Sequence, residues 1–200
     1  MTKDLNVIQD IEKEIDFKGE EIPFEEFCNS NYYREFTYSL DRNGNVIALS
    51  IISVDVHSIA TLQAFKKLEH LILMQCFLSN IRGLDKLINL TTLALSDNLI
   101  SDLTALKGLN NLTTLTLSDN QISDLSTLKG LNNLTTLELS NNKLTDLSTL
   151  KDLNNLTTLD LSDNQLTDLP TLKCLNNLTT LTLSDNQISD LSTLKGLNNL

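Results

Sequence analysis

The chain has 200 residues, of which 44 are leucine, 6 are glycine and 2 are proline, and its formal net charge at pH 7 is −11. This composition excludes collagen-like and glycine- or proline-rich low-complexity proteins. A negatively charged surface repels phosphate backbones and anionic lipid heads, so we expect neither a nucleic acid partner nor a membrane partner. All nine aromatic residues lie within the first 77 positions, so aliphatic side chains must pack the rest of the chain.

The cysteines and the N-terminus bear on the compartment in which the protein works. Cys28, Cys76 and Cys174 are an odd number without close spacing, which indicates reduced thiols rather than a disulfide framework, and they form no zinc motif. Residues 1–14 contain no continuous apolar run, so they match neither a signal peptide nor a transmembrane segment. We therefore expect a cytoplasmic protein.

Residues 1–45 carry no repeat and are expected to form an N-terminal α/β cap. An amphipathic helix is predicted over residues 3–16, because four apolar side chains are spaced for one helical face: Leu5, Ile8, Ile11 and Ile15. Bulk for the cap comes from an aromatic cluster of Phe24, Phe27, Tyr32, Tyr33, Phe36 and Tyr38. Cys28 falls within this cluster, so we expect its thiol to be buried and inert.

The cap is expected to end in a hairpin that leads into the rest of the chain. Asn43-Gly44 is a strong turn signal between a strand at residues 36–40 and another at residues 46–51. A calcium loop at Asp41 is the alternative, but the spacing lacks the glycine and the terminal glutamate of such a loop. We therefore predict a turn.

Residues 46–200 consist of seven 22-residue units and one further residue. The units begin at residues 46, 68, 90, 112, 134, 156 and 178. Units 112–133 and 178–199 are identical at every position, which internal duplication explains most simply. In each unit, leucine or another apolar residue recurs at the first, fourth, sixth and eleventh positions, with asparagine at the ninth in most units.

This L-x-x-L-x-L-x-x-N/C-x-L pattern resembles the leucine-rich repeat, and the resemblance covers residues 46–200. Cys76 takes the Asn/Cys place in the second unit, whereas Val54 departs from it in the first. The unit length and the Asp-Leu at positions thirteen and fourteen are most similar to internalin-type and phosphatase-regulator-type repeats. The resemblance implies an α/β fold: a right-handed solenoid with a parallel β-sheet on the concave face and short 3₁₀ or helical turns on the convex face.

The residues support a stack of strands independently. In residues 114–118, period-two alternation sends Leu115 and Leu117 inward and the hydroxyl side chains outward. No unit can bury its leucines alone, so each depends on its neighbours. We expect a structural ladder in which side-chain amides satisfy turn backbone groups, formed by Asn98, Asn120, Asn142, Asn164 and Asn186.

One aspartate per unit precedes each Leu-x-x-Leu turn. The row consists of Asp102, Asp124, Asp146, Asp168 and Asp190. At the start of a helical turn, a carboxylate can accept hydrogen bonds from free N–H groups. These aspartates would lie roughly 5 Å apart in a line without a converging cage, so we expect no metal site.

No constellation of residues points to catalysis or to a cofactor. His57 and His70 occupy unrelated repeat positions, and His70 is expected to be polar surface on the concave face. Glu138 and Asp160 share the fifth position of adjacent strands, a spacing that invites a glycosidase-like hypothesis. Because an open sheet excludes no water and supplies no aromatic platform for a sugar, we expect no enzyme activity and interpret the pair as an acidic spot for a basic side chain.

We predict a non-catalytic module that binds a protein partner on its concave face. The candidate contact residues are Ile72, Met74, Ala94, Thr114, Thr116, Thr136, Glu138, Thr158, Asp160, Thr180 and Thr182. Most of this face is hydroxyl-rich and poor in the side chains that anchor interfaces. Its apolar N-terminal end, beside Phe77 and Leu99, is either a binding anchor or a surface that the cap covers, and Met74→Asp would separate the two.

The sequence offers two alternative functions, a recognition arm of a larger protein and an ice-binding surface. The acidic N-terminal helix followed by Leu-Asp-x-Asn-Gly-x-Val at residues 40–46 is similar to the start of bacterial Roco-type proteins, which implies a recognition arm of a larger signalling GTPase. No P-loop run occurs in this sequence. The second is a threonine ladder like those of ice-binding solenoids, which Glu138 and Asp160 interrupt.

The end of the chain also carries an expectation. Leu200 is the first position of an eighth unit, and no polar capping segment follows it in this sequence. We therefore expect residues 178–200 to expose leucines and unpaired strand groups, through which the protein could associate with itself or continue into a longer chain.

Overall fold

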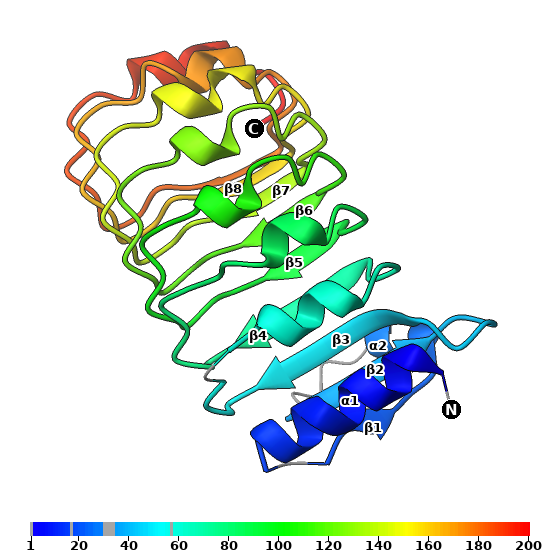
Figure 1. Ribbon diagram of the computed structural model, residues 1–200. Helices are drawn as coiled ribbons and strands as arrows, with labels where there is room; N and C mark the ends of the chain where they lie inside the picture. Colours follow the sequence, from blue (N-terminus) through cyan, green and yellow to red (C-terminus); the bar gives the residue numbers. More distant parts are fainter. Residues whose placement is uncertain (1, 17, 30–34, 57) are drawn as a thin grey trace.

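The computed structural model describes residues 2–16, 18–29, 35–56 and 58–200. From β3 onward, the strands lie side by side in chain order and pair in parallel, and a short 3₁₀ turn follows on the opposite side of the coil (Figure 1). The strands are β3 (Val46–Ile52), β4 (His70–Met74), β5 (Thr92–Ala94), β6 (Thr114–Thr116), β7 (Thr136–Glu138), β8 (Thr158–Asp160) and β9 (Thr180–Thr182). The predicted solenoid with a parallel sheet is confirmed.

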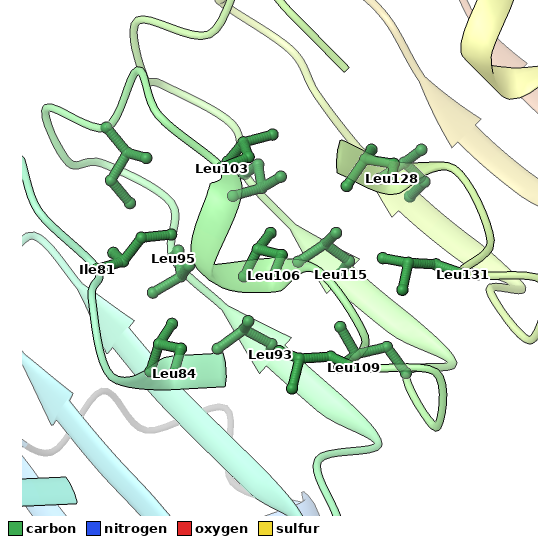
Figure 2. Packing of buried hydrophobic residues seen from close by; sticks show 14 of the residues in the cluster. Ile81, Leu84, Leu93, Leu95, Leu103, Leu106, Leu109, Leu115, Leu128 and Leu131 are labelled. Atoms are coloured by element: carbon green, nitrogen blue, oxygen red, sulfur yellow. The ribbon is translucent and has the colours of Figure 1, made fainter. Parts of the chain in front are cut away.

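The 3₁₀ turns form the second layer of the solenoid. They are η1 (Ala60–Ala64), η2 (Leu84–Lys86), η3 (Thr104–Leu106), η4 (Ser126–Leu128), η5 (Ser148–Asp152), η6 (Leu172–Cys174) and η7 (Ser192–Gly196). Aliphatic side chains from strands and turns fill the space between the two layers, as Figure 2 shows for Leu93, Leu106 and Leu115. Leu115 and Leu117 are fully buried, so the predicted alternation along the strand is confirmed.

The asparagine ladder is confirmed, with each amide serving two repeats. The Oδ1 atom of Asn120 accepts a hydrogen bond from the backbone N–H of Ile100 in the preceding repeat, at 2.9 Å. Its Nδ2 atom donates to the carbonyl oxygens of Leu95, Leu117 and Ser118. Corresponding bonds are made by Asn98, Asn142, Asn164 and Asn186. The ladder thus satisfies buried backbone groups that the strands leave unpaired.

The predicted aspartate contacts at the turns are confirmed in four of the five units. In the unit of η5, the Oδ1 atom of Asp146 accepts from the backbone N–H of Ser148 at 3.0 Å. The same contact is made by Asp102, Asp124 and Asp190. Asp168 differs because the residue two positions later is Pro170, which has no N–H to donate.

The cap begins with the predicted helix, α1 (Lys3–Glu14), whose first turn is capped by Thr2. The buried carboxylate of Asp4 accepts a hydrogen bond from the backbone N–H of Val46 at 2.9 Å, which ties the helix to the first strand of the solenoid. Thr2 donates from its Oγ1 atom to the carbonyl oxygen of Gly44. A Cβ at Gly44 would lie 2.6 Å from the Thr2 side chain, so this close contact requires glycine.

The predicted hairpin is confirmed as β2 (Phe36–Leu40) paired antiparallel with β3. Asp41 stabilises its turn, accepting hydrogen bonds at Oδ1 from the backbone N–H groups of Asn43 and Asn45. Hydrogen bonds from Asn45 and Asn43 hold the pKa of the Asp41 carboxyl below its ordinary value. The carboxylate therefore serves the turn, as the interpretation of this segment predicted.

Two elements of the cap were not predicted: β1 (Glu20–Glu21), which pairs in parallel with β2, and α2 (Phe24–Asn29). Helices α1 and α2 lie on opposite faces of the first strands (Figure 1). Ile8 and Ile11 of α1 join the solenoid core, whereas Phe27 of α2 packs with Ile22 and Ala48 on the other face. Strand β3 is consequently buried on both faces.

Cys28 and His70 lie in environments other than those predicted for them. Cys28 was predicted to be buried but is exposed, because α2 directs Phe27 inward and the next residue points away. His70 was predicted to be exposed surface but is half-buried, with its ring 5.0 Å from that of Phe24. His57 and two members of the predicted aromatic cluster, Tyr32 and Tyr33, lie outside the described residues.

The last repeat is less buried than the others. Leu181, Leu183 and Leu194 are half-buried, and Leu191 and Leu200 are exposed, as the sequence predicted for this unit. Self-association through this surface stays a prediction. Among the described residues, none of the helices is both long and apolar enough to cross a membrane.

Candidate protein-binding surface

The candidate contact residues occupy positions three, five and seven of the 22-residue units, whose side chains point outward from the sheet. We call the surface that they form the concave face. Parallel pairing places equivalent positions of successive units next to one another, as in Thr114 beside Thr136 and Thr116 beside Glu138. All but two of the eleven candidates are half-buried, and Thr180 and Thr182 in the last strand are exposed. The face is therefore one continuous surface rather than a set of separate sites.

Hydroxyl groups form hydrogen-bonded pairs along the concave face. The Oγ atom of Ser140 donates to that of Ser118 at 2.8 Å, and Ser96 donates to Thr116 at 3.3 Å. These contacts run between repeats and hold the side chains in fixed positions. The middle of the face is thus polar, ordered and shallow.

Glu138 and Asp160 face each other across β7 and β8. Burial raises the pKa of the Glu138 carboxyl, and the negative charge of Asp160 raises it further. Asp160 is held by its neighbour Ser162, whose backbone N–H and hydroxyl both donate to its Oδ1 atom, at 2.9 and 2.6 Å. The pair forms an acidic spot in an otherwise neutral hydroxyl surface, and a cationic side chain would relieve the repulsion within it.

The N-terminal end of the concave face is divided between the cap and solvent. Ile72 packs against the cluster of Ile22, Phe27 and Ala48 beneath Phe24, so α2 covers it. Burial against this cap lowers the pKa of the neighbouring His70 imidazole. Met74, two residues further along β4, instead lines an open cavity. The cap therefore covers Ile72 and leaves Met74 at a cavity, and a role of Met74 as a binding anchor stays a prediction.

The turn after β4 places a large aromatic side chain in solvent. Phe77 is 68% exposed, and Leu99, at the equivalent position of the next unit, is 47% exposed. Phe77 has φ of 54°, a left-handed conformation that bulky residues rarely adopt. Cys76 replaces the ladder asparagine here, and its backbone N–H donates to the Oδ1 atom of Asn98 at 3.1 Å.

Cys76 itself is buried, and its Sγ atom contacts the carbonyl oxygens of Ile51 and Met74 at 3.3 and 3.2 Å. Burial raises the pKa of its thiol to about 11. Since the thiolate is the reactive form, this cysteine is inert at neutral pH. Cys76 thus takes the ladder position at the start of the turn that carries Phe77.

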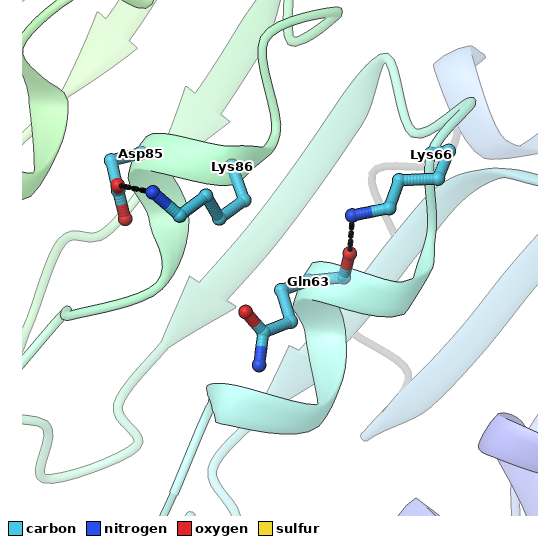
Figure 3. A network of polar contacts seen from close by, with 4 residues as sticks. All are labelled: Gln63, Lys66, Asp85 and Lys86. Atoms are coloured by element: carbon cyan, nitrogen blue, oxygen red, sulfur yellow. Dashed lines mark hydrogen bonds and ion pairs between the residues drawn. The ribbon is translucent and has the colours of Figure 1, made fainter.

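Two polar contacts on the convex face lie within single turns. Lys86 pairs with the adjacent Asp85 at 2.6 Å, and Lys66 donates to the carbonyl oxygen of Gln63 at 2.6 Å (Figure 3). Exposed contacts of this kind contribute little to stability or recognition. Within the described residues, no group of three or more histidine, cysteine, aspartate or glutamate side chains could hold a metal ion.

The repeat spacing, the asparagine ladder and the sheet define a solenoid of the leucine-rich repeat class. A family model for leucine-rich repeats in pairs matches residues 66–108, 110–152 and 154–196. The chain belongs to the leucine-rich repeat family. Domains of this family are typical protein–protein interaction modules, and their stacked repeats create extended concave binding surfaces.

Solved structures of the same class include two bacterial proteins and a plant receptor. Internalin C2 of Listeria monocytogenes is 39% identical with a TM-score of 0.73, over 78% of this chain and 69% of that one. Internalin F of the same organism is 30% identical with a TM-score of 0.73, over 82% of this chain and 50% of that one. Curated protein sequences gave no significant match.

The third structure is the leucine-rich repeat ectodomain of the receptor kinase GASSHO1/SCHENGEN3 from Arabidopsis thaliana, solved in complex with CASPARIAN STRIP INTEGRITY FACTOR 2. It is 27% identical with a TM-score of 0.72, over 82% of this chain. This chain spans half of internalin F and 22% of the plant ectodomain.

Proposed function

We propose that the protein is a non-catalytic interaction module whose protein partner binds on the concave face, anchored at its N-terminal end. The observation that carries the proposal is the exposure of Phe77 and Leu99 in the turns after β4 and β5, together with the cavity that Met74 lines at the end of β4. Large exposed apolar side chains next to a polar surface are typical of protein interfaces, where aromatic residues provide much of the binding energy. The threonine-rich remainder of the face would supply complementary polar contacts.

The experiment compares two exposed apolar residues at opposite ends of the strands. Phe77 follows β4, and Ile88, which is 60% exposed, precedes β5. The full chain and its Phe77→Ser and Ile88→Ser variants are used to capture proteins from the native lysate, and retained proteins are quantified. We expect a partner that Phe77→Ser loses and Ile88→Ser keeps. Equal retention by Phe77→Ser and the unchanged protein would refute the anchor.

The runner-up is a recognition arm of a larger signalling protein such as a Roco-type GTPase. Its support is the hairpin of β2 and β3, which carries the Leu-Asp-x-Asn-Gly-x-Val segment. The sequence of the gene around this region is the test, since a P-loop module in the same reading frame would favour this alternative. A cytoplasmic location is part of both proposals, and the three unpaired cysteines support it.

A further inference from the structure

We infer that the cavity at the N-terminal end of the concave face binds an arginine side chain of the partner. This inference rests on the proposed function, because it names the chemistry of the partner at the same surface. The cavity has a volume of about 330 Å³ and lies between the cap and the first units. Its lining residues are Glu35, Ile52, Ser53, Met74, Gln75 and Asp97.

The cavity has an apolar floor and an acidic rim. Ile52 and Met74 occupy the seventh position of adjacent repeat units. They pair in register at the ends of β3 and β4. Glu35 and Asp97 are exposed and contribute carboxylates from opposite sides, one from the cap and one from the third unit. The six described lining residues include no cation to neutralise them.

Backbone hydrogen bonds hold the rim in place. The backbone N–H of Ile52 donates to the carbonyl oxygen of Glu35 at 2.7 Å, which fixes the cap residue against the first strand. The N–H of Asp97 donates to the carbonyl oxygen of Ser118 at 3.0 Å. Between them, the Ser53 hydroxyl donates to the Oε1 atom of Gln75 at 2.6 Å. The site is therefore formed before a ligand arrives, which lowers the entropic cost of binding.

Arginine fits this arrangement better than other side chains. Its methylene stem can lie on the floor while its guanidinium group remains at the polar rim. The planar guanidinium presents five N–H donors in fixed directions, so it can bind a carboxylate and other acceptors of the polar rim together, and it is less strongly hydrated than the ammonium group of lysine. An uncharged aliphatic side chain would leave the carboxylates without a partner.

The test uses the methionine at the floor of the cavity as a reporter. The sequence has two methionines, so protein labelled with ¹³C at the methionine methyl groups gives few signals, and Met74→Leu assigns the one of interest. Nα-acetyl-arginine amide is titrated into the full chain. We expect a saturable shift of the Met74 methyl signal that Nα-acetyl-norleucine amide does not produce and Nα-acetyl-lysine amide produces at least threefold more weakly.

Two matched variants test whether arginine binds at Asp97. Asp97→Asn should weaken arginine binding about tenfold, because a charge-assisted hydrogen bond is lost. It should fold normally, since Asn141 occupies the same repeat position with the same left-handed backbone. Asp185→Asn, at this position in the last unit, should leave binding unchanged.

Three results would overturn the inference: no saturable shift with arginine, an equal shift with norleucine, or equal binding by the Asp97→Asn and Asp185→Asn variants. Comparable shifts with arginine and lysine would contradict the arginine preference. Partner capture by the Phe77 and Ile88 variants is measured separately. If Phe77→Ser loses a partner that Ile88→Ser keeps but arginine does not bind, only this inference is refuted. If arginine binds but Phe77→Ser retains the same proteins as the unchanged chain, only the proposed function is refuted.

Discussion

The side chain of Asn98 accepts hydrogen bonds at one oxygen from two backbone N–H groups of the preceding repeat, those of Cys76 at 3.1 Å and Leu78 at 2.9 Å. Its Nδ2 atom donates to carbonyl oxygens of both units, including that of Leu73 at 2.8 Å. Each such amide couples one repeat to the next, which is the interaction that makes a solenoid cooperative.

Asn98→Ala should therefore destabilise the protein strongly. The substitution leaves several buried backbone groups without partners, at a cost of roughly 3–4 kcal/mol. Asn186→Ala is the matched control, because Asn186 is only partly buried and its loss should cost roughly 1 kcal/mol. Urea unfolding followed by circular dichroism measures both, and equal losses would contradict the coupling role.

The turn aspartates give a second comparison within the chain. Hydrogen bonds from Ser148 hold the pKa of the Asp146 carboxyl below its ordinary value. This contribution to stability is present above the unfolded pKa near 3.8 and is lost as pH falls through the lower folded pKa. Because solvent screens this exposed carboxylate, Asp146→Ala should lower the free energy of unfolding by only roughly 0.5 kcal/mol at pH 7. Asp168→Ala, beside Pro170, should cost less, and thermal unfolding that ranks the two in the opposite order would refute this explanation.

The pair of Glu138 and Asp160 should make the stability of the fold depend on pH in the opposite direction to Asp146. Burial and the charge of Asp160 raise the pKa of Glu138, so the folded protein binds this proton more tightly than the unfolded chain does. The resulting loss of stability is absent below the ordinary pKa of 4.5 and grows as pH rises through the folded pKa. Glu138→Gln should stabilise the protein by roughly 0.2–1 kcal/mol at pH 7. Urea unfolding at pH 4 should show no such gain, and an equal gain at both pH values would count against the mechanism.

Phe77 illustrates a conflict between stability and binding. Asparagine tolerates the left-handed region, and the exposed phenyl ring contributes little packing. Phe77→Asn should therefore raise the free energy of unfolding by about 1 kcal/mol. The same variant should lose partner capture. A lower melting temperature for Phe77→Asn would show that the ring packs against the protein.

Substitutions at Ile72 and Met74 distinguish a residue that packs against the cap from one that contacts the partner. Ile72→Asp places a charge beneath α2 and should cost roughly 2 kcal/mol. Met74→Asp faces an open cavity, so it should cost less than about 1 kcal/mol and abolish partner capture. Calorimetry and capture on the same two variants test this. A larger loss of stability for Met74→Asp would mean that Met74 belongs to the core.

The repeats could be predicted from the sequence because each structural role recurs at a fixed spacing. The buried Leu115 and the amide of Asn120 follow from their repeat positions alone. The cap lacks this redundancy. Helix α2 has no periodic signal, so the covering of Ile72, the burial of His70 and the exposure of Cys28 depended on long-range packing that local pattern does not encode.

The candidate binding surface could be predicted from the sequence only as one face of the sheet. Strand alternation placed Thr116 and Glu138 on it, and the structure pairs their strands in the expected register. The cavity at Met74 is lined by the cap residue Glu35 and the third-unit residue Asp97, which are 62 positions apart and which no repeat rule connects. The left-handed backbone of Phe77 is likewise outside the repeat rule, because the tenth position of the other described units does not adopt it.

Photo-crosslinking from two positions distinguishes a partner on the concave face from one on the convex side. A benzoylphenylalanine is placed at Thr116 on β6, or at the exposed Lys129 after η4 on the convex side, and the native lysate is irradiated. We predict that the Thr116 position yields a partner adduct that Met74→Asp abolishes, and that the Lys129 position yields none. Adducts formed only from Lys129 would contradict the account.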